Sequence, residues 1–180
     1  NKNKVTITEP YSETFIKDLS SKKKFHSSLK INLPKTLKFR KFSRDLLKEK
    51  FDLIVIALSL SGIDFISKEL KKLKIKNPIL VLTKGLKYEK KNNKILTISE
   101  LLRKNYSGMN ISVLKGPCLA KELAKKSQTN VILANKNIKI AKKIGKMIST
   151  KYYIIEFSND IIGVEICSAI KNIFAMIIGA

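Results

Sequence analysis

The sequence predicts an α/β protein with a doubly wound, mainly parallel sheet covered by helices on both faces. Short apolar runs of strand length recur at 51–58, 79–82, 111–114 and 130–134. Near-continuous apolar character is typical of strands buried on both faces, and longer stretches with helical periodicity separate the runs. This alternation favours a parallel sheet. Hydrophobic residues make up 44% of the 180, which is enough to bury a core.

Each element follows from a local pattern. The first strand is expected over 4–8 (KVTIT) and ends at Glu9, before a polar stretch that carries a helix near 12–19 and a short strand at 37–39. Ser43 is a suitable N-cap for a short helix that follows it. The remaining elements alternate regularly, with helices at 62–73, 98–105, 119–126 and 138–148 and strands at 79–82, 111–114, 130–134 and 152–156.

The chain is predicted to hold two units of unequal size. Strand–helix alternation stops near 158–160, and from Asp160 a long apolar helix runs to the last residue. We expect 1–158 to form one domain and 159–180 to be the first helix of an all-α unit. The sequence begins without Met and stops inside an apolar helical pattern, so we expect it to be a piece of a longer protein.

Basic residues outnumber acidic ones by 37 to 14, which gives a net charge of +23. A surplus of this size suggests nucleic acid or an anionic membrane as a partner. Only three of the basic residues are arginines, and lysine often just solvates a surface instead of binding phosphate in a bidentate way. The lysines are scattered, so we expect no nucleic-acid partner, but a basic nucleic-acid-binding module stays an alternative.

The sequence disfavours metal sites, disulfides and export. Cys118 and Cys167 form no disulfide framework and no metal spacing, and His26 has no second histidine nearby, so we expect no metal. The polar N-terminus lacks a signal-peptide core, and charged residues interrupt the apolar stretch at 161–180, which disfavours a membrane span. A reduced, cytoplasmic setting fits best.

Two predicted turns follow buried strands, at the sheet edge where doubly wound folds bind ligands. The first, TKG at 83–85, places Lys84 where a substrate could lie, although an ordinary surface lysine is the plainer interpretation. The second, at Gly116 and Pro117, leads into a helix that we expect to begin near Cys118. Free N–H groups at a helix start suit anions, but an ordinary structural turn also explains this spacing.

The last helix is unusual in a lysine-rich chain because the segment 152–180 keeps a single lysine, Lys171. Small and polar residues share its side of the helix: Ser168, Asn172, Ala175 and Gly179. A partly desolvated lysine in a cleft can supply charge or move a proton, because burial lowers its pKa toward neutrality. The alternatives are a lysine that extends along the helix surface and one that pairs with Glu165.

Three strings together carry a family resemblance: TKG at 83–85, KGPCLAKE at 115–122 and DIIGVEICSAIKNIFAMIIGA at 160–180. In order and spacing they resemble the motifs of the bacterial-type NAD(P)-dependent glycerol-3-phosphate dehydrogenases. The resemblance runs from about residue 4 to the end of the chain. It implies a Rossmann-like cofactor domain whose first strand and glycine-rich loop precede residue 1, followed by the start of a helical substrate domain.

The resemblance implies an oxidoreductase that interconverts sn-glycerol 3-phosphate and dihydroxyacetone phosphate with NAD or NADP and so supplies phospholipid synthesis. The partner is then a small-molecule substrate, and a homodimer stays open. Matching motif positions imply these roles: proton transfer for Lys171, contact with substrate and cofactor for Lys84, substrate contact for Gly116 and Cys118, cofactor contact for Ala120, and support of the site for Asp160, Glu165 and Asn172.

The chain departs from the family pattern at several positions. Cys118 stands where Ser or Thr is usual, and a thiol is a weaker hydrogen-bonding group. Lys115 replaces the usual Ser, and Leu119 replaces the usual Phe. Glu9 follows the strand at 4–8, where a carboxylate accepts from ribose hydroxyls and repels an extra ribose phosphate, which favours NAD over NADP. A related two-domain dehydrogenase and an inactive fragment remain alternatives.

Overall fold

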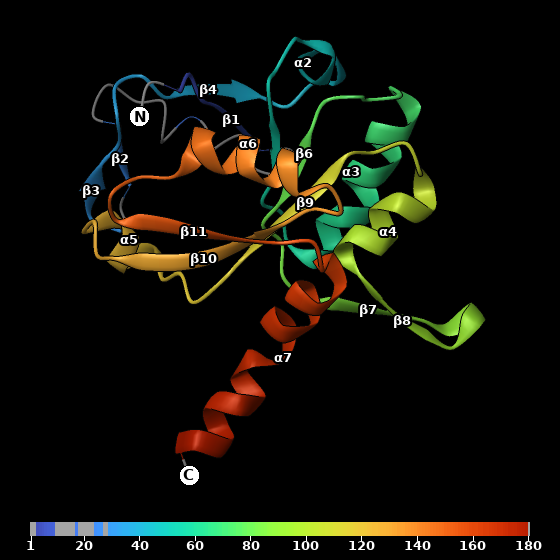
Figure 1. Ribbon diagram of the computed structural model, residues 1–180. Coiled ribbons are helices and arrows are strands. Elements are labelled where there is room, and N and C mark those ends of the chain that lie inside the picture. Colours follow the sequence, from blue (N-terminus) through green and yellow to red (C-terminus); the bar gives the residue numbers. More distant parts are fainter. Residues whose placement is uncertain (1–2, 10–16, 18–23, 27–28, 180) are drawn as a thin grey trace.

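The computed structural model describes residues 3–9, 17, 24–26 and 29–179. Its centre is a five-stranded sheet in the order β11–β10–β9–β6–β5 (Figure 1). The strands are β5 (Ile54–Ile56), β6 (Ile79–Val81), β9 (Ile111–Lys115), β10 (Thr129–Ala134) and β11 (Tyr153–Ser158). Neighbouring strands are parallel except for β9 and β10. The predicted mainly parallel α/β sheet is confirmed.

Helices cover both faces of this sheet. They are α3 (Leu60–Lys72) and α4 (Ile98–Asn105) on one face and α6 (Ile138–Ile148) on the other. Successive side chains of a strand point to opposite faces, so Ile79 and Val81 of β6 enter the first core and Leu80 enters the second. Burying each such side chain contributes about 1.5–3 kcal/mol. The strand that precedes the TKG turn is thus held on both faces.

Helix starts follow the capping residues. Ser43 Oγ accepts from the backbone N–H of Leu46 at 3.2 Å at the start of α2 (Arg44–Lys48), as predicted. α4 begins with a capping box in which the side chains of Thr97 and Glu100 each accept from the other's backbone N–H. These bonds satisfy N–H groups that have no partner within the helix.

β5 is shorter and more exposed than the sequence predicts. The apolar run at 51–58 predicts a strand buried on both faces, but the strand covers only its middle, and Val55 is 49% exposed. Among the described strands β5 pairs with β6 alone and forms an edge of the five-stranded sheet, which leaves Val55 exposed.

Two-stranded sheets accompany the central one. β1 (Thr6–Glu9) pairs in parallel with β4 (Lys38–Lys41), close to the strands predicted at 4–8 and 37–39. The predicted helix near 12–19 lies outside the described residues, apart from residue 17. Two antiparallel hairpins are not expected from the sequence, because their strands are short and not uniformly apolar: β2 (Phe25–His26) with β3 (Ile31–Asn32), and β7 (Leu86–Glu89) with β8 (Lys94–Thr97), joined through the 3₁₀ turn η1 (Lys90–Asn92).

The helix α7 (Ile161–Gly179) starts against the sheet and then leaves the body of the molecule (Figure 1). Ile161 and Glu165 are each 3% exposed, whereas the large apolar residues beyond Lys171 are 53–85% exposed. By length and apolar composition alone, α7 is the helix of the described chain that could cross a membrane.

Candidate active site

A hollow of about 430 Å³ lies where the end of β9 meets the first half of α7. Residues from three segments line it: Lys115, Gly116 and Pro117 at the end of β9, Ile132 of β10, and Asp160, Gly163, Val164, Cys167, Ser168 and Lys171 at the start of α7. Three predicted site residues, Gly116, Asp160 and Lys171, therefore share one hollow.

Lys84 adjoins the hollow from the neighbouring strand. Its Nζ donates to the carbonyl oxygen of Gly116 at 3.4 Å. Burial lowers the pKa of Lys84, and the positive charge of Lys171 lowers that pKa further. Gly116 lines the same hollow as Lys171, so the TKG turn, the turn at Gly116 and the α7 lysine meet at this hollow. Like charges held close together are favourable for an anionic ligand.

Lys171 lines the hollow but is not buried. The sequence predicts a partly desolvated amine, whereas its side chain is exposed. The physical reason is that α7 extends away from the sheet at this position, so no neighbouring element of the described chain covers the side chain. Pairing with Glu165 is not observed, because that carboxylate accepts instead from the backbone N–H of Ser99, at 3.2 and 3.3 Å.

Glu165 anchors α7 to the neighbouring helix. Its side chain is buried, and Ser99 lies in the first turn of α4, where backbone N–H groups lack partners within the helix. The positive end of the helix dipole favours a carboxylate at this place. Glu165 therefore holds α7 against α4 and does not line the hollow.

The TKG turn has a defined shape. Thr83 is buried, and its Oγ1 donates to the carbonyl oxygen of Leu58 at 2.7 Å, which ties the turn to the chain after β5. Gly85 has φ +129°, a conformation that side chains rarely adopt. Lys84 therefore lies between a threonine fixed by a hydrogen bond and a position whose backbone conformation favours glycine.

Gly116 allows a close approach between strands. A Cβ at this position would lie 2.9 Å from the carbonyl oxygen of Asn130 and 2.9 Å from Cγ1 of Val131. The absence of a side chain at Gly116 thus lets the turn after β9 lie close against the backbone of β10. The helix predicted at 119–126 is present but shorter, because α5 (Ala120–Ala124) begins one residue later and Leu119 provides no side-chain cap.

Lys115 is the residue of this region that sequence reasoning missed as a site residue. It is 4% exposed, and its Nζ donates to the carbonyl oxygens of Leu82, at 3.3 Å, and Thr83. Burial lowers the pKa of Lys115 to about 8, with the charge of Glu165 opposing the shift and that of Lys84 adding to it. The only signal in the sequence is its place directly before Gly116.

Several predicted site residues do not line the hollow. Cys118 is half-buried in the turn, and its backbone N–H donates to the carbonyl oxygen of Gly116 at 2.9 Å. Ala120 and Asn172 are exposed, and Glu9 is the last residue of β1. Within the described residues no group of three or more His, Cys, Asp or Glu side chains could hold a metal ion.

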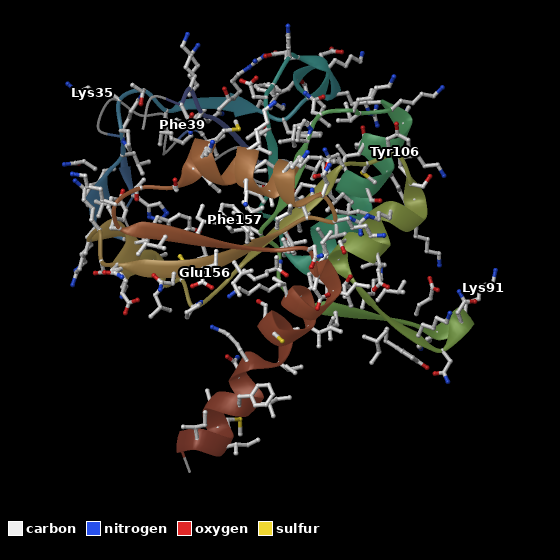
Figure 2. All side chains as sticks on the ribbon, in the orientation of Figure 1. Lys35, Phe39, Lys91, Tyr106, Glu156 and Phe157 are labelled. Atoms are coloured by element: carbon white, nitrogen blue, oxygen red, sulfur yellow. The ribbon has the colours of Figure 1, made fainter. Side chains whose placement is uncertain are left out.

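The positive charge is spread around the molecule. Figure 2 shows Lys35 and Lys91 on opposite sides of the molecule, with other nitrogen-tipped side chains pointing outward between them. Lys84, Lys115 and Lys171 differ from this surface set because they lie together around one hollow.

A family model described as "NAD-dependent glycerol-3-phosphate dehydrogenase N-terminus" matches residues 1–141. A glycerol-3-phosphate dehydrogenase [NAD(P)+] of a Thermotoga species is 35% identical over 132 residues, which cover 73% of this chain and 38% of that protein. The protein of the same description from Rickettsia bellii is 32% identical over 166 residues, 91% of this chain and 51% of that one. The chain thus spans about two fifths to one half of these relatives.

Solved structures show the same fold. A crystal structure of glycerol-3-phosphate dehydrogenase from Coxiella burnetii superimposes with a TM-score of 0.81 at 24% identity, covering 96% of this chain and 52% of that one. The structure of the Dunaliella salina protein gives a TM-score of 0.78 at 20% identity, covering 96% of this chain and 30% of that one. The predicted Rossmann-like architecture followed by the start of a helical domain is confirmed by these likenesses.

Proposed function

Because the chain belongs to the family of NAD-dependent glycerol-3-phosphate dehydrogenases, we propose that it carries the cofactor domain and the first substrate-domain helix of such an enzyme. The enzyme would interconvert sn-glycerol 3-phosphate and dihydroxyacetone phosphate. The proposed units are residues 1–158 and 159–180, with the boundary after β11. The observation that most supports the proposal is the convergence of Lys84, Gly116 and Lys171 at one hollow.

The residues around the hollow suit this chemistry. When the ketone is reduced, a hydride adds to its carbonyl carbon and a proton must reach its oxygen. Lys171, the amine on the α7 side of the hollow, is the proposed donor of that proton, and it takes the proton back in the reverse direction. Lys84, with Gly116 beside it, would attract the phosphate or the carbonyl oxygen by its charge. Asp160 and Glu165 would keep α7 in place.

The residues present fit an anionic cofactor beside this substrate. Three lysines adjoin the hollow, and the Oγ of Ser168, which lines it, is buried without a hydrogen-bond partner in the described part of the chain. When bound, NAD or NADP supplies or accepts the hydride. We propose that Lys84 and Ala120 contact the cofactor and that Glu9, with its carboxylate at the end of β1, favours NAD.

We propose a cytoplasmic enzyme that acts on a small phosphorylated metabolite and supplies phospholipid synthesis. The lysines are scattered through the sequence, which favours a solvated surface over the basic patch of a nucleic-acid-binding module.

A substrate panel tests the proposal. The purified protein is given NADH and, in turn, dihydroxyacetone phosphate, a 2-keto acid and a sugar nucleotide, and oxidation of NADH is followed by absorbance. We expect oxidation with dihydroxyacetone phosphate and a preference for NADH over NADPH. Binding of dihydroxyacetone phosphate without turnover would mark the chain as an inactive fragment, and turnover of another substrate alone would contradict the proposal.

A further inference from the structure

Lys84 and Lys115 lie at the ends of the neighbouring strands β6 and β9. The side chain of each lysine hydrogen-bonds to the backbone that follows the other strand. Lys115, the last residue of β9, donates from Nζ to the carbonyl oxygens of Leu82 and Thr83 after β6. Lys84 follows those carbonyls and donates in the opposite direction, to the carbonyl oxygen of Gly116. We call Lys84 and Lys115 the lysine clasp, because together they join the turn after β6 to the turn after β9.

Lys115 is not one more solvated lysine. An ammonium group removed from water costs several kcal/mol unless hydrogen bonds and opposite charge compensate it, on the order found for buried ions generally. The carbonyls of Leu82 and Thr83 supply the acceptors, and the carboxylate of Glu165 supplies the charge. An ammonium group only donates hydrogen bonds, so it matches a site made of carbonyl oxygens. The buried ammonium group of Lys115 therefore has both hydrogen-bond acceptors and a compensating negative charge, unlike a lysine that is only solvated at the surface.

We propose that Lys115 is a positioning residue of the active site, which holds the carbonyl groups of Leu82 and Thr83 so that Lys84 is presented to the hollow that Lys171 lines. The identity of the ligand in that hollow rests on the proposed function. The motif that this region resembles has a serine in place of Lys115, and a serine side chain is too short to reach across to the neighbouring turn. The clasp is therefore a feature of this chain's own residues.

The clasp also changes the charge of the site. Lys115 adds a third ammonium group beside those of Lys84 and Lys171, and among the residues lining the hollow Asp160 is the acidic one. A phosphate ester carries about two negative charges near neutral pH. Lys115 thus contributes to phosphate affinity without having to touch the phosphate.

The experiment compares Lys115→Met with Lys143→Met, a matched control at an exposed position of α6. Backbone order parameters are measured by NMR, and dihydroxyacetone phosphate affinity by calorimetry. In Lys115→Met we expect the amides of Lys84 and Gly85 to fall from the rigid value of about 0.85 to below about 0.6. Loss of charge-assisted hydrogen bonds is expected to weaken binding roughly tenfold. The control should change neither quantity.

A second variant, Lys115→Arg, keeps the charge and the donors and is expected to restore order at Lys84. Unchanged order in Lys115→Met overturns the proposal, and so does an equal loss of order in β10 and α6, which would indicate a general structural role. If the Met variant does not fold, nuclear Overhauser contacts between the Lys115 side chain and the backbone of 82–84 in the unsubstituted protein decide, and their absence overturns the proposal. Failure of the unsubstituted protein to bind dihydroxyacetone phosphate contradicts the proposed function alone, since the order parameters still test Lys115.

Discussion

The two halves of α7 have similar apolar character and opposite surroundings. In the first half, Ile161 lies in the core of the sheet and Glu165 bonds to the first turn of α4. In the second half the apolar side chains face solvent: Ile173, Phe174, Met176, Ile177 and Ile178. Lys171 lies between the two halves. Apolar composition alone therefore does not decide which part of the helix joins the sheet, whereas the polar anchor at Glu165 marks the half that does.

Truncating an apolar residue in each half should give the largest contrast. Ile161→Ala removes a side chain that is 3% exposed, and such a change costs about 2–5 kcal/mol through lost burial and the cavity left behind. Ile177→Ala removes one that is 69% exposed, and a surface change of this kind stays within about 0.5 kcal/mol. Urea unfolding of both variants measures the difference. Equal losses would show that both halves are packed alike.

Removing the polar anchor should have the next largest effect. Glu165→Ala leaves the Ser99 N–H without its acceptor and removes a negative charge that favours the ammonium form of Lys115. Hydrogen bonds to charged groups contribute about 1.5–3 kcal/mol, so we expect a loss in this range. Glu156→Ala, at an exposed position of β11, is the control and should cost less than about 0.5 kcal/mol. A Glu165→Ala variant as stable as the control would show that the Glu165 side chain does not stabilise the packing of α7.

The cap of α7 should have the smallest effect of the three. Asp160 Oδ1 accepts from the backbone N–H of Gly163 at 2.8 Å, and removing such a cap costs about 0.5–2 kcal/mol. Asp160→Ala is therefore expected to lower the free energy of unfolding by about 1 kcal/mol, with Asn159→Ala as the exposed control. A loss as large as that of Ile161→Ala would show that the cap, and not apolar burial, fixes the first half of α7.

Much of the fold could be predicted from the sequence. The apolar runs of β6, β9 and β10 and the helical period of α6 are local patterns, and the structure places these elements within one or two residues of the predicted bounds. β5 and the hairpin of β7 and β8 could not be predicted in the same way. Edge position exposes Val55, and strands with a mixed burial pattern carry no clear apolar alternation.

Within the site, the sequence could predict the residues that a motif or an unusual composition marks. Lys84 follows a buried strand, and Lys171 is the lone lysine of its segment, and the structure brings both to the hollow. Lys115 gives no comparable signal, because one lysine among many is ordinary and its carbonyl partners lie on another strand. Burial by neighbouring strands is a tertiary property that local sequence does not encode. For the same reason the exposure of Lys171 could not be predicted.

The central claim is that the amine of Lys171 transfers a proton at the substrate held by this hollow. The most direct measurement is kcat for the NADH-dependent reduction of dihydroxyacetone phosphate by the full-length enzyme, compared between the unsubstituted form, Lys171→Met and the surface control Lys143→Met. We predict that Lys171→Met retains its fold and loses roughly 10²-fold or more in kcat, while the control keeps full activity. An unchanged kcat in Lys171→Met would contradict the account.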